Sequence, residues 1–90
     1  MVKLTILYQN PEFTCPEHEL IMRKHRDKII EMVNDGKTNG RRKMRKASET
    51  TYTNTIEFTN RESANEFLSF VTANPRPSPH LNAAIEDIIL

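Results

Sequence analysis

The sequence is poor in the residues that large cores, disulfides and phosphate loops require. Its 90 residues include no tryptophan, one cysteine and two glycines. The single Cys15 excludes an internal disulfide, which fits a reducing compartment. Gly36 and Gly40 cannot form a glycine-rich phosphate loop, and none of the motifs G-x-x-x-x-G-K-S/T, G-x-G-x-x-G or G-x-S-x-G occurs. Nucleotide-dependent enzymes are therefore disfavoured.

Long apolar runs are also missing. No stretch approaches the roughly 20 apolar residues that a membrane-spanning helix needs, and the start MVKLTILYQN lacks the apolar core and cleavage site of a signal peptide. These absences predict a soluble protein of the cytoplasm. A length of 90 residues and a hydrophobic fraction of 37% predict one domain over 1–90, with a thin core that self-association could help to stabilise.

The first half of the chain predicts a strand followed by a helix. Apolar residues alternate over 2–8, which is the period of a strand with one buried face. The segment 14–17, Thr-Cys-Pro-Glu, has the T-x-x-E form of a capping box and predicts the start of a helix. The helix is predicted to end at 34–36, Asn-Asp-Gly. Its apolar positions fall within an arc of about 120°; they are Ile21, Met22, Ile29, Met32 and Val33.

The second half predicts two strands, a helix and an ambiguous tail. Asn39-Gly40 is typical of a tight turn, and 41–50 is predicted to be an edge strand if it is a strand at all. Residues 51–59 alternate as a strand, and 59–62, Thr-Asn-Arg-Glu, form a second T-x-x-E box before a helix that ends at Asn74-Pro75. The tail 81–90 matches helical spacing, yet its last residues also suit a buried strand.

This order of elements predicts an α+β fold. The series β-α-β-β-α lacks only a final strand to become the double β-α-β arrangement of a ferredoxin-like sandwich. We therefore expect an antiparallel sheet with the helices on one face, and 81–90 as its last element, strand or helix.

Charge is strongly segregated along the chain. Residues 20–48 carry a net +7, against −2 for 1–19 and −4 for 49–90, for an overall charge of +1. Six of the ten residues 37–46 are basic; they are Lys37, Arg41, Arg42, Lys43, Arg45 and Lys46. On a strand, alternate members of this run project from opposite faces and could contact phosphates. The run could equally protect a sheet edge from aggregation, or meet the acidic tail of a second copy.

Histidine and cysteine offer only incomplete catalytic or metal-binding patterns. His18-Glu19 begins an H-E-x-x-H motif, but its fifth position is Met22. Cys15, His18 and His25 do not have the spacing of a structural zinc site. His25 falls within the apolar arc of the predicted helix, where it could act as a general base or simply bond a backbone carbonyl. We assign no catalytic residue, metal ligand or cofactor.

Two families resemble parts of the chain. The order of elements resembles the RNA-recognition motif, and NTIEFTNRESANEFLSF is similar in rhythm to its third strand and second helix. That family stacks bases on aromatic residues of its sheet, whereas threonines occupy these positions here. MVKLTILYQNPEF with a helical His25 is similar to the dimeric α/β-barrel group of small monooxygenases, which implies a sheet-to-sheet dimer around a pocket.

The sequence favours a small binding protein over an enzyme. Nucleic acid is the leading partner, bound through the basic segment 37–46, and an acidic protein surface is another. The alternatives are a dimeric α/β-barrel-type enzyme that uses His25, and a regulatory or scaffold homodimer with no ligand. We expect no membrane partner.

Overall fold

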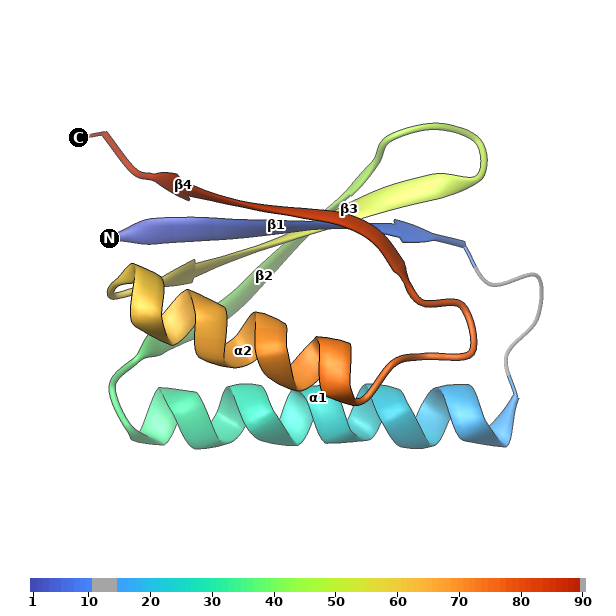
Figure 1. Ribbon diagram of the computed structural model, residues 1–90, viewed down its shortest axis with the longest axis horizontal. Helices are drawn as coiled ribbons and strands as arrows, with labels where there is room; N and C mark the ends of the chain where they lie inside the picture. Colours follow the sequence, from blue (N-terminus) through green and yellow to red (C-terminus); the bar gives the residue numbers. More distant parts are fainter. Residues whose placement is uncertain (11–14, 90) are drawn as a thin grey trace.

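The protein is an α+β domain with one four-stranded sheet. The computed structural model describes residues 1–10 and 15–89. Its elements, in chain order, are β1 (Val2–Gln9), α1 (Pro16–Asn34), β2 (Thr38–Lys46), β3 (Thr51–Phe58), α2 (Arg61–Ala73) and β4 (His80–Asp87). The strands form an antiparallel sheet in the order β2-β3-β1-β4, and both helices lie on the same side of it (Figure 1). The predicted α+β class and the succession of elements are confirmed.

The ambiguous tail is a strand. β4 pairs with β1 from Val2 opposite Asp87 to Leu7 opposite Asn82. Its alternate residues Ala83 and Ile85 pack against the core. The helical spacing of the tail is therefore overridden, because β1 offers a sheet edge whose backbone groups need partners.

The core lies between the sheet and the two helices. β1 contributes the alternating residues predicted from its sequence, and β3 contributes the same face through its register with β1. The aromatic rings of Phe58 and Phe67, from β3 and α2, lie 5.8 Å apart at its centre. The buried apolar residues are Val2, Leu4, Ile6, Tyr8, Ile29, Met32, Ile56, Phe58, Ala64, Phe67 and Val71.

Helix α1 departs from the predicted pattern at its start and along its face. Its N-cap is Cys15, which makes no side-chain capping bond, and Thr14 of the predicted capping box lies outside the described residues. His18 and His25 are buried in the stripe that faces the core, whereas Val33 is 41% exposed. The predicted end is confirmed.

That end is a glycine-closed turn. Gly36 has a φ of +73°, and the amides of Gly36 and Lys37 donate to the carbonyls of Val33 and Met32. This pair of bonds satisfies carbonyls that a helix end otherwise leaves unpaired.

Two further predictions are wrong in their details. Asn39-Gly40 is not the tight turn between strands: it lies inside β2, where the pairing register shifts between Thr38 and Arg42. Gly40 has a φ of +77° there, which glycine adopts without strain. In α2 the cap is Asn60 and not Thr59, since the Asn60 side chain accepts from the Ser63 amide at 2.8 Å. An amide oxygen is as good a cap as a hydroxyl, so the motif is displaced by one residue.

Candidate nucleic-acid interface

Strand β2 forms the edge of the sheet and carries the basic residues on both of its faces. Lys43 and Arg45 lie opposite Thr55 and Thr53 of β3, on the face without helices. Arg42 lies opposite Ile56, a core residue, and so points to the helix side. All residues of 41–46 are exposed. The predicted edge strand is confirmed, and so is its division into two faces.

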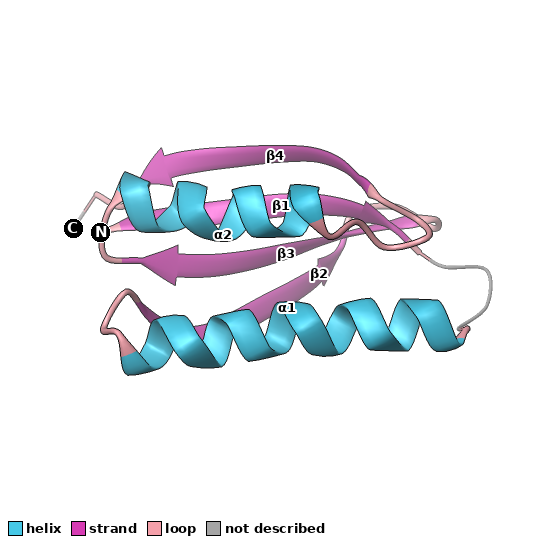
Figure 2. Ribbon diagram, turned by 60° about the horizontal axis from the view of Figure 1, so that its bottom comes forward, coloured by secondary structure: helices cyan, strands magenta, loops and turns pink. Residues whose placement is uncertain are grey.

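The exposure of β2 follows from its direction. The strand begins beside the C-terminal end of α1 and runs away from the helix (Figures 1 and 2). A Cβ at Gly40 would lie 2.7 Å from Val33 Cγ2, so helix and strand are in tight contact at this point. Farther along, the helix-side residue Met44 is 66% exposed. The second half of β2 therefore presents its basic side chains without cover.

The basic residues of β2 have no acidic partners among residues 1–10 and 15–89. The ion pairs in this part of the chain involve other bases, such as Lys3 with Glu86 and Arg61 with Asp87. We call the five basic residues of β2 the basic strip: Arg41, Arg42, Lys43, Arg45 and Lys46. Within the part of the chain that the structure describes, these side chains form no ion pair and are exposed to solvent.

Lys37 is separated from the basic strip. Its Nζ lies 2.8 Å from Glu66 Oε1, and Lys28 Nζ lies 3.1 Å from the other carboxylate oxygen. The hydrogen bond with Glu66 raises the pKa of Lys37, and the hydrogen bonds from Lys37 and then Lys28 lower the pKa of Glu66. Lys37 thus joins the start of β2 to α2.

The helix-free face holds a shallow depression of about 610 Å³. Charge changes sign across it: Arg41, Lys43 and Arg45 of β2 border one side, and Glu57 of β3 and Asp87 at the end of β4, which also pairs with Arg61, border the other. Its lining residues are Lys3, Asn39, Arg41, Lys43, Arg45, Thr55, Glu57, Asp87, Ile88 and Ile89. None of the described residues that line this depression is aromatic, so they offer no ring on which bases can stack.

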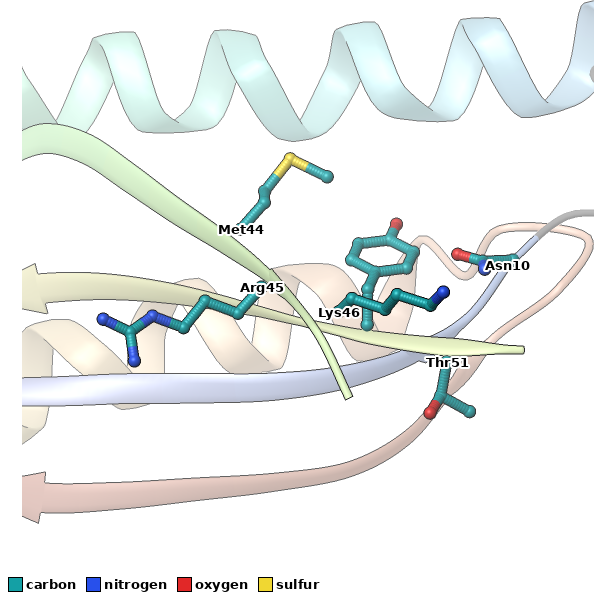
Figure 3. Close-up of a pocket in the computed structure, with 6 residues that line it drawn as sticks. Asn10, Met44, Arg45, Lys46 and Thr51 are labelled. Atoms are coloured by element: carbon teal, nitrogen blue, oxygen red, sulfur yellow. The ribbon is translucent and has the colours of Figure 1, made fainter. Parts of the chain in front are cut away.

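A second pocket, of about 420 Å³, lies at the end of β2 (Figure 3). It is lined by Asn10, Met44, Arg45, Lys46, Thr51 and Tyr52. Met44 points toward α1, while Arg45 points the other way. This pocket combines an apolar side chain, an aromatic ring, an amide and two cations at one end of the basic strip.

Behind this pocket lies a cluster that the sequence pattern did not reveal. Arg76 is only 3% exposed, and its guanidinium lies 4.3 Å from the ring centroid of Tyr8. It donates to the Tyr52 hydroxyl at 2.6 Å, to Gln9 O at 2.9 Å and to Ser78 O at 3.0 Å. Burial raises the pKa of Tyr8, partly offset by the positive charge of Arg76. Arg76 therefore binds the 74–80 connector to the ends of β1 and β3.

His25 is held between the helices and the same connector. The histidine is 3% exposed, and its Nε2 donates to Asn74 O at 2.8 Å. Its ring meets Phe70 edge-on at a centroid distance of 6.1 Å. Burial lowers the pKa of His25, although the bond to Asn74 acts in the opposite direction. No carboxylate or nucleophile bonds to it in the described part of the chain, and the bond that it forms is to a backbone carbonyl, which is one of the two alternatives that the sequence left open.

The described residues contain no cluster of three or more histidine, cysteine, aspartate or glutamate side chains that could hold a metal ion. In the same residues, no helix is long and apolar enough to cross a membrane. Comparison with known proteins found no family model that matches the chain and no curated relative.

Proposed function

We propose that the protein binds nucleic acid through the basic strip. The observation that carries this proposal is a row of five cations on an exposed sheet edge, none paired with an acid among the described residues. Arg and Lys neutralise phosphates, and binding releases counterions, so such a row gives affinity independent of base sequence.

The spacing of the strip supports contact with one nucleic-acid strand. Alternate residues of a strand lie about 6.6–6.8 Å apart, which is comparable to the separation of adjacent phosphates along one strand. Lys43 and Arg45 form such a pair on the helix-free face. Arginine can also fork to two phosphate oxygens, which fixes the register of the backbone.

The fold proposed for this function is ferredoxin-like. Its support is the double β-α-β succession and the strand order, which reads β4-β1-β3-β2 from the other edge. Cys15 is the single cysteine of the chain, which favours a cytoplasmic setting for the proposed function.

The decisive experiment is a salt titration of oligonucleotide binding. If the strip neutralises about four phosphates, the slope of log K against log salt is roughly −2.8 for a single strand and −3.6 for a duplex. Replacing Lys43 and Arg45 by Ala removes two contacts and flattens that slope by about 1.4–1.8.

A charge-matched control separates the strip from general charge attraction. Arg23 and Lys24 are exposed on α1, and their double replacement by Ala lowers the net charge by the same amount. We expect this control to keep the slope of the native protein. The proposal would be contradicted if both variants flattened the salt slope equally, or if the native protein did not bind near physiological salt.

A homodimer is the second candidate, favoured by the sign change across the helix-free face. A two-fold axis parallel to the strands would place β2 of one copy over β4 of the other, whose helix-free face carries Glu86. Ile89, 95% exposed, adds an apolar contact at the rim. Sedimentation equilibrium tests this candidate: a monomer at high protein concentration and low salt excludes it, and a dimer that Glu86→Lys disrupts supports it.

A further inference from the structure

The pocket at the end of β2 has walls suited to a flat, partly apolar ligand. Met44 exposes 66% of its surface and points toward α1, on the helix side of the sheet (Figure 3). Tyr52 pairs with Tyr8 in the sheet and shares that side with it. A volume of about 420 Å³ lies at the lower end of the range of small-molecule sites. It is large enough for a single nucleobase.

The aromatic wall is held rigidly in place. The Tyr52 ring stacks on Tyr8 with a centroid distance of 5.4 Å and an angle of 22° between the planes. Its hydroxyl accepts the 2.6 Å bond from Arg76. Arg76 is itself buried and fixed by backbone carbonyls of Gln9 and Ser78. Because these contacts already fix the ring, stacking of a ligand on it costs the protein little conformational entropy.

The polar wall offers hydrogen-bonding groups that bonds among the described residues leave largely unused. The Asn10 amide nitrogen reaches Glu49 O only at 3.5 Å, while the Asn10 backbone is held by a 2.8 Å bond to Thr50 O. An amide side chain on a fixed backbone can pair with the edge of a base. Lys46, which belongs to the basic strip, lies opposite Tyr52 on the helix side and lines the same pocket, so a phosphate next to the bound base would meet this cation.

We propose that this pocket binds one unpaired nucleobase of a single strand whose phosphates lie on the basic strip. The inference rests on the proposed function and names its ligand class: single-stranded nucleic acid, with one base turned toward Met44 and Tyr52. A duplex is excluded as the ligand of this pocket, because its bases are stacked and paired and cannot enter. Base stacking on a protein aromatic strengthens binding between about fivefold and a hundredfold.

The experiment compares two oligonucleotides of equal length and charge: a single-stranded oligothymidylate, and an abasic strand with the same phosphates. The native protein is expected to bind the thymidylate strand about fivefold to a hundredfold more tightly. Met44→Ala and Asn10→Ala should reduce this ratio toward one and leave the salt slope unchanged, since they remove no charge. Leu81→Ala, at an exposed position of β4, is the control and should keep the native ratio.

A spectroscopic readout reports on the aromatic wall itself. The chain has no tryptophan and two tyrosines, so Tyr8→Phe leaves Tyr52 as the only tyrosine emitter. Thymidylate strands should quench this emission, and abasic strands should not.

The outcomes separate this inference from the proposed function. Equal affinities of the native protein for the two strands, with a normal salt slope, overturn the base pocket and leave phosphate binding intact. Absence of binding to either strand overturns both.

Discussion

Replacement of Arg76 by Met is expected to destabilise the domain strongly. The substitution keeps an unbranched side chain of similar length but removes three donors, leaving the Tyr52 hydroxyl and the carbonyls of Gln9 and Ser78 without their partner. These bonds are only partly buried, so each group left unsatisfied costs about 1 kcal/mol, the low end of the range for buried groups, and loss of the cation–π contact with Tyr8 adds about 1 kcal/mol. Arg76 has no carboxylate partner among residues 1–10 and 15–89, and relief from burying its charge offsets part of that sum. We expect a net loss of about 3 kcal/mol, a large share of the roughly 5–15 kcal/mol typical of a domain.

Urea unfolding followed by far-UV circular dichroism measures this loss. Arg61→Met is the matched control, because the Arg61 side chain is 56% exposed and its pair with Asp87 spans 3.4 Å. Such exposed pairs contribute about 0–1 kcal/mol. Arg76→Lys should fall between the two, since an ammonium keeps the charge but not the planar fork. If Arg76→Met and Arg61→Met unfold at the same urea concentration, Arg76 does not hold the connector to the sheet.

Three further predictions concern His25, Gly40 and Asn60. Burial lowers the pKa of His25, so the unfolded chain takes up a proton on this histidine more readily than the folded protein does. The stability that is present above the ordinary pKa of about 6.5 is therefore lost as pH falls below it. Thermal unfolding should show a melting temperature that decreases from about pH 7.5 to 5.5, and His25→Gln should flatten this dependence. Gly40→Ala places a Cβ 2.7 Å from Val33 Cγ2 at a φ of +77°. In urea unfolding it should therefore lose more stability than Gly36→Ala, whose Cβ meets open space and whose backbone strain costs only about 1–2 kcal/mol. Equal losses of stability would contradict the contact with Val33. Asn60→Ala should remove about 1 kcal/mol of stability by the same measurement, whereas a comparable loss in Thr59→Ala would mean that the cap is wrongly placed.

The elements with strong local signals were predictable. The period-2 alternation of 2–8 and 51–59 corresponds to β1 and β3, and Gly36 marks the end of α1 because only glycine enters the left-handed region at no steric cost. Helix caps were displaced by one residue where two competent cap residues adjoin, as at Thr59-Asn60. The tail remained ambiguous because Ile85 fits both periods, and only pairing with β1 decides it.

The sequence predicted only part of the candidate site. The basic strip is a local feature of composition, so it could be named before its position on the sheet edge was known. Arg76 donates a hydrogen bond to the carbonyl of Gln9, which lies far away in the chain. No local sequence pattern predicts such a contact. Asn39-Gly40 was wrongly predicted to be a turn because the same dipeptide suits a turn and a bulge. The register shift between Thr38 and Arg42 occurs where Gly40 lies close to Val33, a contact that no local pattern predicts.

The most direct test of the central claim is a map of backbone amide shifts in the ¹⁵N-labelled protein on addition of a short single-stranded oligonucleotide at low salt. We predict that the perturbed amides cluster on β2 and the start of β3, around 41–46 and 51–52, and that Lys43→Ala with Arg45→Ala abolishes most of the changes. Perturbations confined to the outer face of α1, or none at all, would contradict nucleic-acid binding by the basic strip.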